Sequence, residues 1–176
     1  IQIDADPLAD GRTYANKFFV CGDATVTLQA LLERVRGKMA VDPAFAEQLA
    51  VLKRDVRQKF IASLGPYASL PDQARAAMPR DAIWARDVTI SNTTWGNRAM
   101  PLFDPTQNVY PVGAGIGQGL CLGIGAALGA RGRKTVVMTG DGGFFLNVGE
   151  LWTAVQEKLD LCTIVMNDKG YGVIKN

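Results

Sequence analysis

Two short polar stretches carry the residue types of this chain that could do chemistry. The first, 140–143, reads Gly-Asp-Gly-Gly around Asp141, and the second, 167–170, reads Asn-Asp-Lys-Gly around Asp168. Aspartate oxygens and loop carbonyls suit Mg²⁺, which keeps few protein ligands and takes the rest from water and phosphate. Backbone N–H groups left open by glycines, at the start of a following helix, suit a phosphate beside the metal. The residue types therefore predict a site for a metal ion and a diphosphate.

Each of these stretches follows an apolar run that predicts a buried strand, 135–138 and 162–166. The segment between them has the length of a helix, and strand, helix and strand together predict a βαβ unit with parallel strands. Open α/β sheets bind ligands at the carboxyl ends of their strands, so Asp141 and Asp168 are expected to converge there. An ordinary glycine turn and a solvated Asn-Asp turn are the alternative, and they do not require the two carboxylates to meet.

The helix between the strands has its own signals. Leu151, Val155 and Leu159 recur at a spacing that places them on one helical face, which we expect to be buried. Asn147 and Glu150 have the separation of a capping box, so the helix is predicted to begin after Asn147.

The spacing of the two polar stretches resembles the signature of the thiamine-diphosphate-dependent enzymes. In that family a Gly-Asp-Gly is followed by an Asn-Asn pair, and here 24 residues, 143–166, separate Gly140-Asp141-Gly142 from Asn167-Asp168. The resemblance implies Mg²⁺ held by Asp141, Asp168 and the carbonyl of Gly170, and thiamine diphosphate as cofactor. This chain has Asp168 where Asn is usual, which adds charge and keeps an oxygen ligand. The glycines expected to contact the diphosphate are Gly140, Gly142 and Gly143.

A glycine-dense segment, 112–129, contains no register of Gly-x-Gly-x-x-Gly, which counts against a dinucleotide-binding Rossmann enzyme. The resemblance implies that Ile116 bends the cofactor and that the carbonyl of Ala114 accepts a hydrogen bond from its 4′-amino group. Core packing is the alternative for Ile116. Further upstream, a strand at 82–88 leads into a hydroxyl-rich loop, where diphosphate contacts or a plain polar turn are equally open. The candidates in that loop are Thr89, Ser91 and Asn92.

The resemblance also organises the chain into an α/β fold with a parallel sheet. Residues 1–36 resemble the tail of the middle domain in the acetolactate-synthase branch, with an Ile-x-Ile-Asp-x-Asp-Pro strand. Residues 37–75 are expected to form a helical connector with a basic face, and 76–176 a thiamine-diphosphate-binding domain truncated at its C-terminus. Asp4 and Asp6 could form a metal pair, but a turn made by Pro7 explains them more simply.

Composition narrows the class of protein. A net charge of +2 with no dense Lys/Arg stripe gives no sign of a nucleic-acid partner, and no 18-residue apolar run predicts a membrane span. The three cysteines, Cys21, Cys121 and Cys162, lack metal-ligand spacing. We expect them to be free, with Cys121 and Cys162 buried, in a reducing compartment such as the cytoplasm. The chain contains no histidine.

The resemblance implies an enzyme that decarboxylates a 2-oxo acid and joins the product to a second carbonyl, as acetolactate synthase does. The alternatives are a simple decarboxylase of the benzoylformate-decarboxylase kind, a non-catalytic paralogue that keeps the fold, and a metal–phosphate module unrelated to thiamine. No catalytic residue is expected within this chain. The family's activating glutamate lies in an N-terminal pyrimidine-binding domain, usually of a second subunit, so a homodimer or homotetramer is expected.

Overall fold

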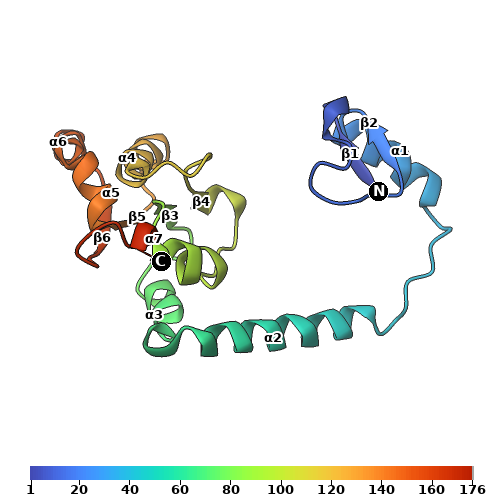
Figure 1. Ribbon diagram of the computed structural model, residues 1–176, viewed down its shortest axis with the longest axis horizontal. Coiled ribbons are helices and arrows are strands. Elements are labelled where there is room, and N and C mark those ends of the chain that lie inside the picture. Colours follow the sequence, from blue (N-terminus) through green and yellow to red (C-terminus); the bar gives the residue numbers. More distant parts are fainter. Residues whose placement is uncertain (176) are drawn as a thin grey trace. The chain divides into compact units, whose positions relative to one another are not determined.

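The computed structural model describes residues 1–175, the last of them by its backbone alone, and divides into two compact units, Ile1–Ala50 and the chain from Val51 on (Figure 1). The first unit contains β1 (Gln2–Asp4), β2 (Phe19–Cys21) and α1 (Ala24–Val35). Helix α2 (Phe45–Ser63) crosses the division. The second unit contains α3 (Leu70–Ala76), β3 (Ile83–Arg86), β4 (Asn108–Val109), α4 (Gln118–Gly129), β5 (Thr135–Gly140), α5 (Asp141–Leu146), α6 (Leu151–Gln156), β6 (Leu161–Met166) and α7 (Gly172–Lys175).

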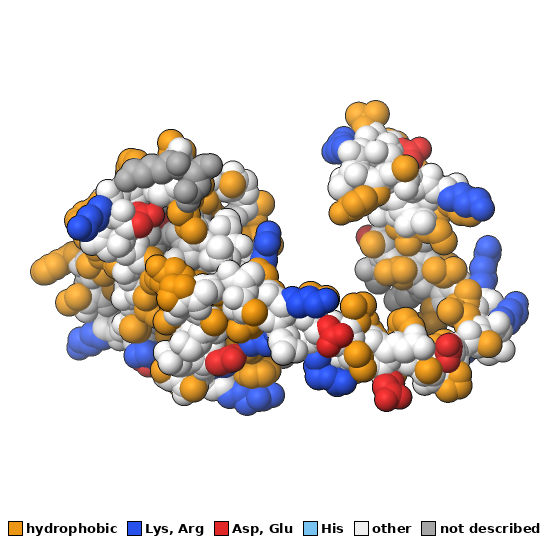
Figure 2. All heavy atoms as spheres, turned by 60° about the horizontal axis from the view of Figure 1, so that its bottom comes forward, with side chains coloured by type: hydrophobic (Ala, Val, Ile, Leu, Met, Phe, Trp, Pro, Cys, Tyr) orange, Lys and Arg blue, Asp and Glu red, His pale blue; other side chains and the backbone are white. Residues whose placement is uncertain are grey.

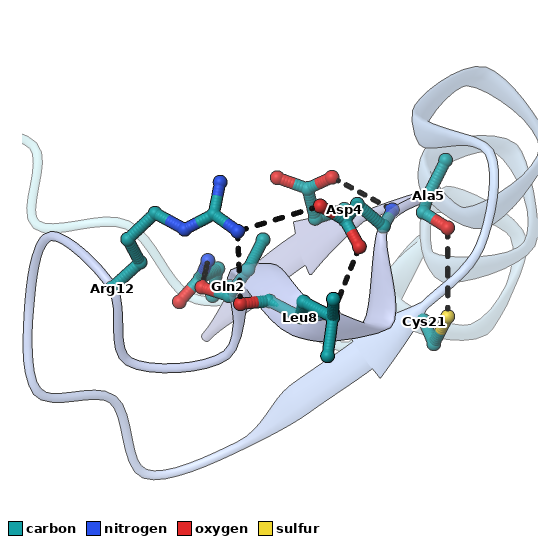
Figure 3. Close-up of polar contacts among 8 residues, drawn as sticks. Gln2, Asp4, Ala5, Leu8, Arg12 and Cys21 are labelled. Atoms are coloured by element: carbon teal, nitrogen blue, oxygen red, sulfur yellow. Dashed lines mark hydrogen bonds and ion pairs between the residues drawn. The ribbon is translucent and has the colours of Figure 1, made fainter.

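The first unit is a parallel pair of short strands, β1 and β2, followed by α1. The backbone N–H of Val26 donates to the carboxylate of Asp23 at 2.9 Å, which makes Asp23 the N-cap of α1. Figure 3 shows the turn after β1, where Asp4 accepts a hydrogen bond from the backbone N–H of Asp6 at 3.0 Å. Asp6 in turn accepts from Leu8 and pairs with Arg12. Both carboxylates therefore serve the turn.

The second unit is built on a four-stranded, all-parallel sheet in the order β4-β3-β5-β6. Helix α4 covers one face, where Gly123 lies against Ala85 and Val137. The other face carries the larger core cluster, whose members come from the strands and from the segment that follows β3. The buried residues of that cluster are Trp84, Trp95, Ala99, Met100, Val136 and Met138. Because both faces are covered, β3 and β5 are buried along nearly their whole length, as βαβ geometry requires.

The connector region contributes to this core from one end of α2. Phe60, Ile61 and Leu64 pack against the larger cluster, and Arg57 donates to the backbone carbonyl of Ala99 at 2.9 Å. The rest of α2 buries none of its residues, and Figure 2 shows hydrophobic side chains between charged ones along this helix. The described part of the chain contains no helix that is long and apolar enough to cross a membrane.

The helix predicted after Asn147 is arranged differently from the sequence prediction. Helix α5 already begins at Asp141, and Asn147 makes no capping bond to α6; its amide donates instead to the carbonyl of Gly117 at 2.6 Å. Helix α6 ends at Gln156, because Lys158 has a positive φ of 50°. Leu159 lies beyond the helix and packs against a smaller core cluster formed by Leu120, Ile124 and Ala154. The predicted burial of Leu151 and Val155 is wrong: both are exposed, and Ala154 faces the core.

The prediction of buried thiols is also wrong. Cys21, Cys121 and Cys162 are free, as expected, but all three are exposed. Cys162 lies on β6, an edge strand of the described sheet, which its neighbours cover only in part. Partial desolvation of the exposed Cys121 thiol, with smaller contributions from Glu150 and Asp87, raises its pKa above the ordinary value.

Candidate functional site

A cleft of about 690 Å³ opens at the carboxyl ends of β3, β5 and β6. It receives residues from five separate parts of the second unit: the end of α2 with the turn that follows it, the segment after β3, the glycine-rich loop before α4, the start of α5 and the segment after β6. Every candidate residue predicted from the sequence lines this cleft except Asn92. The candidates that do are Thr89, Ser91, Ala114, Ile116, Gly140, Asp141, Gly142, Gly143, Asp168 and Gly170.

Asp141 and Asp168 reach the cleft from adjacent strands. In the ladder between β5 and β6, Gly140 is paired with Met166, so Asp141 and the turn at 167–170 leave the sheet at the same level. One carboxylate oxygen of Asp141, Oδ2, accepts from the backbone N–H of Gly170 at 3.0 Å. The geometric expectation that the two acidic turns share one site is therefore met by the strand order and by this direct contact.

The other carboxylate oxygen of Asp141, Oδ1, is buried and has no hydrogen-bond partner. A buried, unsatisfied carboxylate oxygen carries a full desolvation cost unless a ligand completes it. No three acidic, Cys or His side chains come together within the described residues. A cation here would therefore rest on two carboxylates, backbone carbonyls and oxygens of a ligand or water. That donor set fits Mg²⁺, whose shell is commonly completed by phosphate.

The segment after β6 has an unusual backbone conformation and leaves no room for a side chain at Gly172. Lys169 and Gly170 have φ values of 62° and 153°, in the left-handed region. A Cβ on Gly172 would overlap the carboxylate of Asp168, and a Cβ on Gly142 would lie 2.7 Å from the ring of Tyr171. Tyr171 therefore packs over the start of α5, a contact that the sequence did not predict.

The glycine-rich loop before α4 presents Ala114 and Ile116 to the cleft. Ala114 has a φ of 59°, which a residue other than glycine rarely adopts and which marks a position fixed by its surroundings. Ile116 is exposed and lines the cleft, so it does not fill the core in this chain. Its action on a bound cofactor stays a prediction.

The segment after β3 was expected to be a loop, and it is helical, with a π-helical stretch at Asn92–Gly96. Thr89 accepts a hydrogen bond from the backbone N–H of Asn92 at 2.9 Å, which starts this helical segment. The side chain of Asn92 accepts from Arg86 at 3.0 Å. Because the side chain of Asn92 is hydrogen-bonded to Arg86, Asn92 does not line the cleft. Thr89 and Ser91 do line it.

Arg86 anchors that wall from inside the protein. Its guanidinium is almost fully buried and donates to the side-chain oxygens of Asn92, Asn97 and Asn108. Burial lowers the pKa of Arg86 below its ordinary value, and the nearby Tyr110 opposes that shift. The network ties the helical segment and β4 to the end of β3, and hence fixes the position of Thr89 and Ser91.

Sequence reasoning missed several residues that build the site. Ser63, Leu64 and Tyr67 from the connector line the cleft, and Asp87 lies buried directly behind it. The connector residues gave no local signal, because their place depends on how α2 packs. Asp87 did give one: it is an acidic residue at the carboxyl end of a buried strand.

The second unit is thus an α/β domain with a parallel sheet. Two acidic turns and a glycine-rich loop lie at the carboxyl ends of its strands, where domains of this class bind ligands and cofactors. The family "Thiamine pyrophosphate enzyme, C-terminal TPP binding domain" matches residues 90–176. The chain therefore belongs to the thiamine-diphosphate-dependent enzymes, and this domain is the part of them that binds the cofactor.

Individual relatives agree with this assignment. The chain is 35% identical to a probable 2-ketoarginine decarboxylase of Pseudomonas aeruginosa, over 100% of the chain and 32% of the relative. It is 30% identical to the catabolic acetolactate synthase of Raoultella terrigena, over 99% of the chain and 32% of the relative. A solved thiamine diphosphate-dependent 4-hydroxybenzoylformate decarboxylase of Rhodococcus jostii RHA1 superposes with a TM-score of 0.54 at 30% identity, over 61% of this chain and 20% of that one. The chain spans about a third of the length of the curated relatives it matches.

Proposed function

We propose that this chain is the diphosphate- and Mg²⁺-binding part of an enzyme that decarboxylates a 2-oxo acid and joins the product to a second carbonyl. The observation that carries the proposal is the buried, unpartnered Oδ1 of Asp141 at the cleft, beside the turn that bears Asp168 and Gly170. The names of the relatives, decarboxylases and acetolactate synthases among them, support the reaction class.

The roles of the residues are inferred from the resemblance to the family, and their common place at the cleft supports them. Asp141, Asp168 and the carbonyl of Gly170 would hold the metal, which would supply positive charge to a bound diphosphate. Gly140, Gly142 and Gly143 line the same cleft, where their backbone N–H groups would donate to phosphate oxygens. The carbonyl of Ala114 and the side chain of Ile116 position the thiamine end. Bound thiamine diphosphate supplies the electron sink for loss of CO₂ from the substrate.

This chain has no histidine, and we assign no proton transfer to its residues. We propose that the activating glutamate comes from a pyrimidine-binding domain, contributed by a second subunit of a homodimer or homotetramer. We also propose that residues 1–36 belong to a middle domain, 37–75 to a connector and 76–176 to the cofactor domain. The free, exposed cysteines are compatible with a reducing cytoplasm.

The reaction is tested on the full-length protein with thiamine diphosphate, Mg²⁺ and pyruvate as the first of a series of 2-oxo acids. Formation of acetolactate supports ligation, whereas acetaldehyde supports the alternative of a simple decarboxylase. Tight cofactor binding without CO₂ release from any 2-oxo acid would identify a non-catalytic paralogue. Calorimetry with ADP in place of thiamine diphosphate completes the test, and a preference for ADP would overturn the proposal.

The proposed assembly is supported by apolar side chains exposed on α5 and α6. Phe145 is 71% exposed and Trp152 is 74% exposed, with Leu146 and Val155 also open. Large exposed apolar side chains on two consecutive helices favour a contact with another chain, and tryptophans that become buried in such contacts often dominate their energetics. We therefore expect Trp152→Ser in the full-length protein to raise the dissociation constant of the subunits at least about tenfold, as measured by sedimentation velocity.

Tyr14 provides the control for this prediction, because it is an aromatic residue of the first unit that is 79% exposed. Tyr14→Ser is expected to leave the dissociation constant unchanged. An unchanged sedimentation profile for Trp152→Ser would place the subunit contact elsewhere.

A further inference from the structure

Asp87 is a buried carboxylate on which two segments distant in the sequence converge. It follows β3 directly and is 0% exposed. The backbone N–H of Gly117, 30 residues away, donates to its two oxygens at 3.0 and 3.1 Å. The hydroxyl of Thr139, near the end of β5, donates to Oδ2 at 3.0 Å, and the backbone N–H of Val88 donates to Oδ1 at 2.7 Å. Its oxygens are thus occupied by the protein itself.

Two glycines pack against the same carboxylate. A Cβ on Gly143 would lie 2.5 Å from Oδ2 of Asp87, and a Cβ on Gly119 would lie 2.6 Å from the Cβ of Asp87. Both distances are below any ordinary carbon contact, so these backbones approach Asp87 only because they lack side chains. Gly143 lies in α5 and lines the part of the cleft proposed to bind the diphosphate, which we call the diphosphate wall (Gly140, Gly142 and Gly143). Gly119 lies in the first turn of α4.

Gly117, which donates to both oxygens of Asp87, connects the glycine-rich loop to α4. It is the N-cap residue of α4, with a φ of 86°, and it follows Ile116 directly. Its carbonyl accepts from the side-chain amide of Asn147 at 2.6 Å, so the backbone N–H and the backbone carbonyl of Gly117 are both bonded to side chains. The loop that presents Ala114 and Ile116 is therefore fixed at its C-terminal end by Asp87 and Asn147.

We propose that Asp87 is a positioning residue, which fixes the loop bearing Ala114 and Ile116 relative to the diphosphate wall. Gly117 and Thr139 donate to the same carboxylate, which joins the loop to the end of β5 in addition to the bond from the Asn147 amide to the carbonyl of Gly117. The inference rests on the proposed function, in which the metal turns hold the diphosphate and the loop holds the thiamine end. Its consequence is selective: loss of Asp87 weakens recognition of the thiamine end more than that of the diphosphate.

The test compares two ligands on the full-length protein, thiamine diphosphate and inorganic pyrophosphate, each titrated calorimetrically in saturating Mg²⁺. Asp87→Asn keeps the shape of the side chain but replaces one accepting oxygen by a donor, and Asp87→Ala removes both. Hydrogen bonds to charged groups have free energies that correspond to about tenfold to a hundredfold in a binding constant. We expect the ratio of the dissociation constants, thiamine diphosphate over pyrophosphate, to rise at least about tenfold in Asp87→Ala and less in Asp87→Asn.

Gln107 provides a matched control. It is also buried and makes four hydrogen bonds, with Phe103, Asp104, Arg80 and Ala82, none of which lines the cleft. Gln107→Ala is expected to lower the melting temperature and leave the ratio unchanged. If Asp87→Asn and Asp87→Ala lower the melting temperature with the ratio unchanged, Asp87 is merely structural and the inference is overturned. Failure of the unsubstituted protein to bind thiamine diphosphate would instead overturn the proposed function.

Discussion

Replacement of Asp141 by alanine in the full-length protein is expected to raise the dissociation constant for thiamine diphosphate in saturating Mg²⁺ by more than about a hundredfold. Residues that only orient a metal ligand typically change metal affinity by about tenfold to a hundredfold, so removal of a ligand has a larger effect. Asp141 has a second role, because its Oδ2 accepts from the N–H of Gly170 and so holds the facing turn. Isothermal titration calorimetry with and without Mg²⁺ measures the dissociation constant for thiamine diphosphate and its dependence on the metal.

Asp160→Ala is the matched control for Asp141→Ala. Asp160 is an aspartate at the opposite end of β6, with an exposed side chain whose ion pair is with Lys134. Exposed ion pairs contribute about 1 kcal/mol or less, so this variant should bind the cofactor normally. Unchanged cofactor affinity in Asp141→Ala, with the protein folded, would contradict the assignment of the metal site.

Replacement of Gly119 by alanine is expected to destabilise the second unit by about 1–3 kcal/mol, the range for overpacking in a tight core. The added Cβ would lie 2.8 Å from the backbone nitrogen and 3.0 Å from the Cα of Asp87. Both are backbone atoms at the end of buried β3, so a side-chain rotation cannot relieve the contact. Helix α4 would have to move away from the sheet. The melting temperature from differential scanning calorimetry measures the effect.

Gly125→Ala tests whether this effect comes from packing or from the loss of glycine itself. Gly125 lies in the same helix, and a Cβ there would meet nothing within 4 Å. Alanine has a higher helix propensity than glycine by up to about 1 kcal/mol, so Gly125→Ala should raise the melting temperature or leave it unchanged. Equal destabilisation by both substitutions would show that the close approach of α4 to Asp87 is not what requires Gly119.

The second unit was predictable where the evidence is local. The apolar runs at 135–138 and 162–166 predicted β5 and β6, because strands of a parallel sheet tend to be continuously apolar. Strand β5 is covered on both faces, whereas β6, at the edge of the described sheet, is covered only in part. In the first unit, the N-cap role of Asp23 also depends on local sequence alone, because the side chain and the N–H from which it accepts are three residues apart. The burial of Leu151 and Val155 was not, because helical periodicity identifies an apolar face without identifying what covers it.

The sequence by itself determined the chemistry of the site, because ligand type belongs to the side chain and the spacing of Asp141 and Asp168 follows from one βαβ unit. Only the tertiary structure decided which oxygen of Asp141 is left without a partner and that Asn92 is turned to Arg86. It also decided the role of Asp87, whose partners lie 30 and 52 residues away in the chain. The physical reason is that buried polar groups compete for the same few partners, and the outcome depends on which segments meet in space.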